Sequence, residues 1–460
     1  MRTVNPTALA EIEVFLTTST AAQFLGRQQL IPTRRLGAAE LDELRQTKGF
    51  EELVPERGVG AVFEHERVEF PSYPYEWPPE MLYAAGMLTL DLAQACLGDG
   101  YSLKDATPYN VLFLGSKPVF IDVLSFERRI PGDPIWKPDA QFCRTFLLPL
   151  LAYKYWGTRP ADVFAKHRDG FEANDVYRLC GPVRKFLPPF LTQVSLPTWL
   201  SRKDAGGAIY RDRVLQNHEQ ARFILDSLFN RLRRSLQRVE PKPARHTVWS
   251  DYKDSCSYTE ANFAAKEEFV SNALAELKPG RVLDIGCNTG HFSELAARGG
   301  AKVVAIDSDL GCVGAVWRQA RDHNRNVLPL VVDLCRPSAG EGWRNHECAS
   351  FLERATGAFD AVLMLAVLHH LLVTERIPLE EVLDLAGDLT TDLLIIEFVS
   401  TDDKMFQTIA RGRQHLHGGL TEANFEAACR RRFQIVRSKQ LEGGRRRLYL
   451  LRKTSRKEST

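Results

Sequence analysis

Patterns for metal binding and for disulfide frameworks are missing from this sequence of 460 residues. Its nine cysteines include no C-x-x-C pair, and no cluster of His and Cys stands at the spacing of metal ligands. A zinc module or a disulfide scaffold would need such spacing, so neither is expected and no metal cofactor is predicted. An odd number of scattered cysteines is typical of a protein in a reducing compartment.

Long hydrophobic runs and a targeting segment are also missing. No stretch approaches the roughly 18 uninterrupted apolar residues that span a bilayer. The N-terminus carries the acids Glu11 and Glu13, whereas a secretory signal would be cationic and then apolar. The net charge of +2 gives no overall attraction to nucleic acid, and the basic clusters 430–432 and 445–447 are expected to be solvated faces. We expect a cytoplasmic protein that associates with neither membrane nor nucleic acid.

The length and the composition fit a globular protein with more than one domain. Hydrophobic residues make up 44% of the chain and charged residues 26%, and a chain of this length can form two or three cores. The stretch 239–247, VEPKPARHT, has two prolines and mixed charges after a segment, 210–239, with helical periodicity. We predict an N-terminal α+β domain at 1–240 and an α/β domain at 247–460.

A strand, a glycine turn, a helix and a second strand are predicted in succession at 281–309. Apolar residues before Asp284 predict the first strand, Gly286 and Gly290 lie in the turn, and the second strand ends at Asp307. This order is typical of a nucleotide-binding βαβ unit. Glycine lets the backbone approach a ligand where any Cβ would collide. The carboxylate of Asp307 can accept hydrogen bonds from both hydroxyls of a ribose.

The residues of this turn indicate which nucleotide it suits. A dinucleotide site requires G-x-G-x-x-G, but Asn288 and His291 stand where its second and third glycines would fall. The pattern D-x-G-x-x-x-G, headed by Asp284, instead resembles motif I of the class I S-adenosylmethionine-dependent methyltransferases. This resemblance implies a cationic ligand with an amino-acid tail. A carboxylate at the turn suits such a ligand better than it suits a pyrophosphate.

Later segments resemble the same family in the same order. Asp333 lies in LVVDLC, where the family's third strand ends; 359–371 matches the fourth strand and the loop beside the transferred methyl group; and 393–398 matches the fifth strand. Segments 433–439 and 446–452, joined around two glycines, predict a β-hairpin. The resemblance covers the whole back half and implies a seven-stranded Rossmann-like sheet with a terminal antiparallel hairpin.

The family resemblance also implies which residues hold S-adenosylmethionine. Asp307 would bind the ribose, Asp333 would bind the adenine, and Asp284 would face the amino-acid tail. The backbone around the methionine part would be shaped by three residues of the turn: Gly286, Asn288 and Gly290. Asn288 replaces a frequent middle glycine, which is a tolerated variant in the family.

The segment 258–277 predicts a helix that leads into this motif. In the family such a segment often covers the cofactor, so Tyr258 and Lys266 are candidate contacts. The alternative is that both belong to an ordinary amphipathic helix.

Two adjacent histidines are the candidate catalytic residues. His369 and His370 directly follow the fourth strand, at the carboxyl edge where α/β sheets bind ligands. A neutral imidazole can accept a proton from an acceptor hydroxyl near pH 7, so one of the two is the candidate base. The alternative is that the pair only shapes the loop. Glu397 and His291 are weaker candidates.

The front half contains a second pattern, built around a predicted hairpin. Segments 111–114 and 119–123 are apolar and flank a Gly-Ser pair. Asp105 and Asn110 precede this hairpin, and Asp122 lies at the end of its second strand. The acids and the amide therefore lie at the two ends of one short structural unit.

The spacing of Asp105, Asn110 and Asp122 resembles the catalytic loop and the metal-binding aspartate of protein kinases and small-molecule phosphotransferases. That resemblance would make Asp105 the base and the other two the magnesium ligands. However, Leu103 stands where that family has His, and no G-x-G-x-x-G lies upstream. We expect a kinase-like ancestry with residues that now cap turns; the alternative is active phosphotransfer.

An aromatic and proline-rich segment, 70–79, reads FPSYPYEWPP and leads to a helix predicted to begin near Glu80. Tyr73, Tyr75 and Trp77 are candidates to wall an acceptor pocket, and the alternative is structural packing. Together with LKDATPYN and LAVLHHLL, this segment resembles a bacterial methyltransferase group that includes nodulation proteins.

These observations predict an S-adenosylmethionine-dependent methyltransferase whose front half selects a small-molecule or glycan acceptor. Oxygen is preferred over nitrogen as the methyl acceptor, because AVLHHL lacks the Asn/Asp-Pro-Pro-Tyr/Phe motif of amide and base nitrogen chemistry. The alternatives are a bifunctional or kinase-derived protein with a phosphotransferase-like N-terminal domain, an RNA or protein methyltransferase, and a binding protein with an inert cofactor site.

Overall fold

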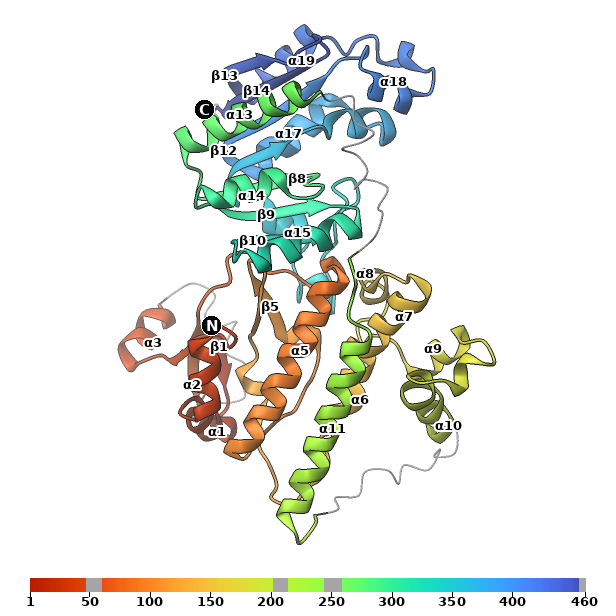
Figure 1. Ribbon diagram of the computed structural model, residues 1–460. Coiled ribbons are helices and arrows are strands. Elements are labelled where there is room, and N and C mark those ends of the chain that lie inside the picture. Colours follow the sequence, from red (N-terminus) through yellow and green to blue (C-terminus); the bar gives the residue numbers. More distant parts are fainter. Residues whose placement is uncertain (47–59, 202–213, 244–258, 455–460) are drawn as a thin grey trace. The chain divides into compact units, whose positions relative to one another are not determined.

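The computed structural model describes residues 1–46, 60–201, 214–243 and 259–454. The chain divides into two compact units, each with its own core (Figure 1). The front unit comprises Met1–Tyr75 and Pro79–Pro241, and the back unit comprises Glu76–Pro78 and Lys242–Thr460.

The back unit is built on one seven-stranded sheet. Its strands are β8 (Arg281–Ile285), β9 (Lys302–Asp307), β10 (Val327–Val331), β11 (Phe359–Met364), β12 (Thr390–Val399), β13 (Phe433–Gln440) and β14 (Arg446–Lys453). Their spatial order is β10-β9-β8-β11-β12-β14-β13; the first five are parallel, and β14 is antiparallel to both β12 and β13. The predicted Rossmann-like sheet with a terminal antiparallel hairpin is confirmed.

Helices cover both faces of this sheet. They are α13 (Glu260–Leu277), α14 (His291–Arg298), α15 (Leu310–Asp322), α16 (Phe351–Ala355), α17 (Leu379–Leu389), α18 (Lys404–Ala410) and α19 (Glu422–Cys429). The unit β8–α14–β9 steps one way along the sheet and β11–α17–β12 steps the other way. Because such crossovers are right-handed, α14 and α17 lie on opposite faces (Figure 1). The strand order reverses between β8 and β11, which is where α/β sheets open a ligand crevice.

The core of the back unit explains why its strands are apolar on both faces. Val282 and Leu283 in β8 are fully buried although their side chains point to opposite sides of the sheet. Helices cover both sides of a parallel sheet, so neither face can be polar. The core cluster joins Val270 of α13 to Ala305 of β9 and Ile395 of β12.

The front unit is an α+β assembly. Its strands are β1 (Arg2–Val4), β2 (Thr33–Arg35), β3 (Ala61–His65), β4 (Tyr101–Leu103), β5 (Val111–Leu114), β6 (Lys117–Phe120) and β7 (Phe126–Arg128). Its helices are α1 (Pro6–Leu16), α2 (Ser19–Gly26), α3 (Ala38–Arg45), α5 (Pro79–Cys96), α6 (Asp139–Phe142), α7 (Leu148–Trp156), α8 (Pro160–Phe164), α9 (Ala173–Leu179), α10 (Leu196–Ser201) and α11 (His218–Arg238). The strands form the antiparallel sheet β1-β3-β2 and the two-stranded pairs β4-β7 and β5-β6.

Helix α5 is the central helix of the front unit. In the part of the chain that the structure describes, the stretch 79–99 is the one helical segment long and apolar enough to cross a membrane. However, 61% of the 18 residues that make it so apolar are buried inside the protein. A Cβ on Gly86 would lie 3.1 Å from Phe146 and 3.2 Å from Leu236 of α11, so this glycine allows close helix packing. These contacts are those of a core helix.

The second strand of the front hairpin differs from the prediction. It was expected at 119–123, but β6 ends at Phe120. The amide of Ile121 donates to the carbonyl of Asn110 at 2.9 Å, and the amide of Ser125 donates to the carbonyl of Asp122 at 3.1 Å. The first bond continues the β5-β6 register by one more residue pair, and the second closes a turn over 122–125, so the chain leaves β5 at Asp122.

Candidate functional site

The glycine turn that follows β8 lies against the loop that follows β11. Gly286 has φ +69°, and its amide and that of Cys287 donate to the carbonyl of Ile306 at 2.8 and 3.0 Å. A Cβ on Gly286 would lie 2.4 Å from Cγ2 of Val367, so only glycine fits there. Ala366 in the facing loop has φ +57°, a conformation that costs about 1–3 kcal/mol in a non-glycine residue and clusters at functional sites.

The rest of the turn holds the end of β9. Asn288 has φ +49°, which Asn tolerates better than most residues, and its amide donates to Oδ2 of Asp307 at 2.9 Å. Gly290 has φ +81° and precedes α14, and a Cβ there would lie 2.8 Å from Cγ2 of Val316. The departure from the family's middle glycine at Asn288 is therefore compatible with the turn.

Asp307 ends β9 beside this turn. Its Oδ1 accepts a hydrogen bond from the amide of Asp309 at 2.9 Å, in addition to the bond from Asn288. Burial raises the pKa of Asp307, although these backbone bonds oppose the shift. Each carboxylate oxygen has a second lone pair, so both can still accept from a ligand hydroxyl.

Asp284, in β8, is 2% exposed. Oγ of Ser293 donates to its Oδ2 at 2.6 Å. The pKa of Asp284 is raised to about 6, mainly by burial and also by the nearby Asp307 carboxylate, while Ser293 and Lys266 act in the opposite direction. A buried carboxylate with few compensating donors favours a cationic ligand.

Asp333 lies two residues beyond β10, and its side chain is 38% exposed. The amide of Cys335 donates to its Oδ1 at 2.9 Å, and Nε of Arg336 lies 3.2 Å from its Oδ2. The neighbouring parallel strands β8, β9 and β10 thus carry one acid each at or beyond their carboxyl ends, offset by two residues from one strand to the next.

The two candidate catalytic histidines differ in burial. His369 is 1% exposed, and neither of its ring nitrogens has a hydrogen-bond partner among the described residues. Burial lowers the pKa of His369 to about 3, with His370 and Arg446 adding to the effect. His370 is only partly buried; burial and then Arg446 lower its pKa. The two ring centroids are 4.3 Å apart.

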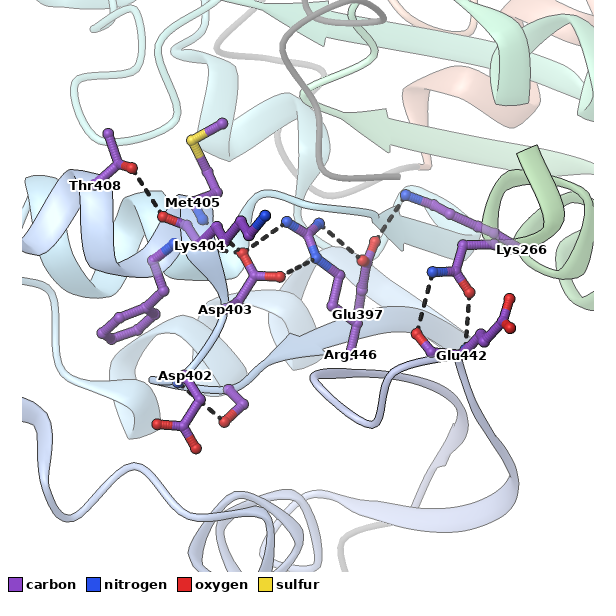
Figure 2. Close-up of polar contacts among 12 residues, drawn as sticks. Lys266, Glu397, Asp402, Asp403, Lys404, Met405, Thr408, Glu442 and Arg446 are labelled. Carbon is purple, nitrogen blue, oxygen red and sulfur yellow. Dashed lines mark hydrogen bonds and ion pairs between the residues drawn. The ribbon is translucent and has the colours of Figure 1, made fainter. Parts of the chain in front are cut away.

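A buried ionic network of four side chains joins four elements (Figure 2). Nζ of Lys266 in α13 is 2.7 Å from Oε2 of Glu397 in β12, and the Arg446 guanidinium in β14 is 3.3 Å from Oε1. Arg446 also binds both oxygens of Asp403, at 2.8 and 3.0 Å. All four side chains are at most 7% exposed.

This network balances two cations with two anions, which is what burial of charge requires. Asp403 also caps α18, because its Oδ1 accepts from the amide of Met405 at 2.9 Å. Burial raises the pKa of Asp403, but its bonds to Arg446 outweigh burial and leave the pKa below its ordinary value. Lys266, a candidate cofactor contact, belongs to this network, whereas Tyr258 lies outside the described residues.

The prediction that 445–447 is a solvated basic face was wrong for Arg446. Its side chain is 7% exposed, whereas that of Arg447 is 29% exposed and pairs with Glu422 at 2.8 Å. Successive residues of a strand point to opposite faces, so one of two adjacent arginines had to point inward. This alternation was the signal available in the sequence. Asp403 was not identified from the sequence at all.

A cleft of about 1370 Å³ lies in the back unit. Its walls come from the short helix η9 (His370–Thr374), the start of α17, helix α18, the short helix η10 (Gln414–His417) and α19. His370 lines it. Of the two weaker catalytic candidates, Glu397 belongs to the buried network, and the ring of His291 has its centroid 4.9 Å from that of Phe263.

The front motif is partly assembled. Nδ2 of Asn110 donates to Oγ of Ser125 at 3.1 Å, and Oγ of Ser125 donates to Oδ2 of Asp122 at 2.6 Å. Oδ1 of Asp122 pairs with the guanidinium of Arg2. Asp105 is exposed, and among the described residues no hydrogen bond or ion pair joins it to Asn110 or Asp122, so only two of the three predicted residues are linked.

The aromatic segment before α5 is mostly packed. Trp77 and Tyr75 are buried, and the ring centroids of Tyr73 and Tyr75 are 5.5 Å apart. Glu76, which groups with the back unit, is also buried, and its carboxylate pairs with Arg354. These residues favour the packing interpretation.

Comparisons with known proteins agree with this geometry. A protein-family model described as a methyltransferase domain matches residues 258–420. The nodulation protein NoeA of Rhizobium meliloti (strain 1021) is 30% identical over 396 residues, which cover 85% of this chain and 82% of NoeA.

Two solved structures similar to this chain are methyltransferases. The N-methyltransferase NodS of Bradyrhizobium japonicum WM9 is 16% identical, with 43% of this chain and 99% of that chain covered and a TM-score of 0.31. The magnesium protoporphyrin IX methyltransferase ChlM of Synechocystis PCC 6803, with bound SAH, is 20% identical, with 50% and 94% covered and a TM-score of 0.31.

Proposed function

The chain belongs to the class I S-adenosylmethionine-dependent methyltransferases, and from this membership we propose that it methylates a hydroxyl oxygen of a small-molecule or glycan acceptor in the cytoplasm. The observation that carries this proposal is the position of His370. It lines the large cleft, and it lies three residues after Val367, which faces Gly286 of the cofactor turn. One short loop thus lies next to both the cofactor turn and the cleft.

The residues at the crevice fit S-adenosylmethionine. Gly286 and Gly290, both at positive φ, allow a tight turn at the end of β8, and the buried carboxylate of Asp284 and the partly buried carboxylate of Asp307 suit a cation. When bound, the cofactor supplies a methyl group on a sulfonium. We assign the ribose to Asp307, the adenine to Asp333 and the amino-acid tail to Asp284. The backbone around the methionine part is assigned to three residues: Gly286, Asn288 and Gly290.

We assign the role of base to His370 and a supporting role to His369. A base must be neutral and accessible, and a pKa near the working pH makes proton transfer efficient. The pKa of His369, lowered to about 3 by burial, makes it a weak base. His370 is less buried and lines the cleft, so it is the residue that can take a proton from an acceptor. Such a base contributes a factor of about 10²–10⁴ in rate.

A base beside the cleft supports oxygen as the acceptor atom. A hydroxyl must lose its proton during methyl transfer, whereas an uncharged amine can attack the methyl group without first losing a proton. NodS is described as an N-methyltransferase, so nitrogen is the competing acceptor. The two are distinguished by the product, since methyl ethers and methylamines differ in acid-base behaviour and mass fragmentation.

The test is transfer of a labelled methyl group to fractionated metabolite and glycan extracts, followed by mass spectrometry of the product. With the acceptor in hand, kcat/KM is expected to fall as the pH drops through the pKa of His370, which burial places below 6.5. His370→Gln should lower kcat by about 10²–10⁴ and remove this acid limb. An unchanged pH profile in that variant would contradict the assignment.

Phosphotransfer by the front unit is the alternative function. The contact from Asn110 through Ser125 to Asp122 favours it, because it joins the two expected magnesium ligands. The ion pair with Arg2 opposes it, because the guanidinium places a positive charge beside Asp122, where a magnesium ion would have to bind. Magnesium-dependent ATP turnover that is lost in Asp122→Ala would establish this activity.

A further inference from the structure

We propose that the methyl acceptor is an anionic amphiphile, a single soluble molecule in which a hydrocarbon segment carries a phosphate or carboxylate in addition to the acceptor hydroxyl, and that it binds in the cleft between η9, α18 and α19. This inference rests on the proposed methyltransferase function and adds the substrate class to it. It is carried by the combination of an apolar floor, uncompensated arginines and a catalytic candidate in one cleft.

The floor of the cleft is apolar. It includes Leu372, Ile377, Ile409, Leu420 and Ala428. A small core cluster of Val399, Phe406 and Ala410 supports it from below. Leu416 also lines the cleft and is 67% exposed. A hydrocarbon segment would bury these side chains, and burial of apolar surface is the main source of affinity for such ligands.

The rim of the cleft is strongly cationic. Among the described residues that line the cleft there is one carboxylate, that of Glu380. Four arginines line it as well: Arg376, Arg411, Arg413 and Arg431. Among the described residues, none of these four side chains forms a hydrogen bond or an ion pair. A planar guanidinium matches a carboxylate or a phosphate with two parallel hydrogen bonds, so an anionic group is the complementary ligand.

The neighbours of Arg431 show that this lack of partners is local. Arg430 pairs with Glu426 at 2.7 Å, and Arg432 pairs with Asp384 at 3.1 Å and Asp388 at 2.7 Å. Arg431, between them, faces the cleft. Three consecutive arginines therefore divide into two with acidic partners in the protein and one whose guanidinium is available to a ligand.

The cleft is connected to the cofactor turn through charged groups. Arg446 lowers the pKa of His370 and binds Glu397, and Glu397 binds Lys266, which in turn lowers the pKa of Asp284. A ligand that extends from the arginine rim along the apolar floor reaches the wall formed by His370. This places the acceptor next to the candidate base.

The test is isothermal titration calorimetry of the full chain, with saturating SAH, against three probes. Octyl phosphate has both features, 1-octanol has only the chain, and inorganic phosphate has only the charge. We expect octyl phosphate to bind at least about tenfold more tightly than either of the others. Butyl phosphate, with four fewer methylenes, should bind on the order of 100-fold more weakly than octyl phosphate.

Variants separate the two halves of the site. The double variant Arg413→Gln/Arg431→Gln should weaken octyl phosphate about tenfold and leave 1-octanol unchanged. Arg430→Gln, the paired neighbour, should change neither, and it is the matched control. Leu416→Gln should weaken octyl phosphate without affecting inorganic phosphate. The affinity for SAH should stay the same in all three.

Several outcomes would overturn the proposal. Equal binding of octyl phosphate and inorganic phosphate would remove the apolar half, and equal effects of Arg430→Gln and the double variant would remove the arginine rim. Binding only to phosphatidylglycerol vesicles would make the cleft a membrane surface instead. If the chain still binds SAH but does not bind octyl phosphate, this inference alone is overturned. The same holds if the cleft is filled by a segment of the chain itself and therefore excludes octyl phosphate. No binding of SAH would overturn the proposed function and this inference with it.

Discussion

Asp284, which we assign to the cofactor site, also affects the stability of the protein. Its pKa is raised from 3.8 to about 6, mainly by burial, so the folded protein holds this proton more tightly than the unfolded chain does. The free energy of unfolding therefore falls as the pH rises between these two values, by about 3 kcal/mol in all. Above pH 6 the ligand-free protein contains a buried charge, which a bound cation would compensate.

Asp284→Asn is expected to stabilise the ligand-free protein at pH 8, because the amide can keep the bond from Ser293 without the buried charge. The gain in the free energy of unfolding should be up to about 3 kcal/mol and should narrow toward pH 5. Urea denaturation of both proteins at pH 5 and pH 8 measures this gain, and titration with SAH in parallel measures cofactor binding. The same variant should bind SAH more weakly. Asp333→Asn, at an exposed position, is the control, and an equal stability gain there would contradict the explanation.

The two histidines show what the sequence could not distinguish. His369 and His370 are adjacent and identical in type, so the sequence predicts the pair and not the individual roles. His369 is buried and His370 partly buried, a difference set by tertiary packing that two adjacent identical residues do not reveal in the sequence. By contrast, the cofactor residues were predicted by position, since Asp307 ends a strand and Gly286 lies in the turn that follows another.

At the scale of elements, the contact between the β8 turn and the β11 loop can be tested directly. Gly286→Ala should lower the free energy of unfolding by about 2–4 kcal/mol, because φ +69° disfavours a Cβ and Val367 occupies its space. Adding Val367→Ala to this variant should recover the part of the lost stability that comes from the steric clash, but not the part that comes from the positive φ. Urea denaturation of the single and double variants measures both. Additive effects would mean that the two residues do not interact.

The buried network makes a prediction about two neighbouring arginines of β14. Arg446→Met should lower the free energy of unfolding by about 3–5 kcal/mol, because it leaves the carboxylates of Asp403 and Glu397 incompletely paired. Arg447→Met removes a partly exposed pair and should cost less than about 1 kcal/mol. Chemical denaturation compares the two, and similar losses would mean that the network is not buried in solution.

The elements themselves were predictable to different degrees. The terminal hairpin was predicted from two apolar segments around Gly443 and Gly444, and β13 and β14 lie there. Helix α11 begins at His218, whereas the predicted segment began at 210, and 210–213 lie outside the described residues. The end of β6 was missed because the chain leaves β5 in a short turn, closed by the amide of Ser125 on the carbonyl of Asp122, and the apolar residues 123–124 do not reveal that turn.

At the scale of the whole molecule, two cores imply two responses to ligand. Calorimetry of the full chain is expected to show two unfolding transitions, and SAH should move only the one that belongs to the back unit. At 100 times its dissociation constant, SAH should add about 2.7 kcal/mol to that transition. Equal shifts of both transitions, or a single transition, would show that the units unfold together.

The sequence predicted the cofactor better than the acceptor for a physical reason. The cofactor turn is a continuous segment whose glycines and acids stand at fixed spacing, so a single sequence reveals it. The cleft combines 370–380 with 408–431, and its arginines become a binding feature only when those segments fold together. Discontinuous sites of this kind leave no short motif.

The link between Asp403 and Arg446 has a consequence for protein engineering. Helix α18 is tied to the sheet at its first turn by this ion pair, and the small cluster Val399, Phe406 and Ala410 supports its other end. Residues 411–420 could therefore be exchanged for those of a relative while both anchors and the buried residues of α19 stay in place. Such chimaeras would transplant selectivity for new acceptors onto an unaltered methyl-donor half.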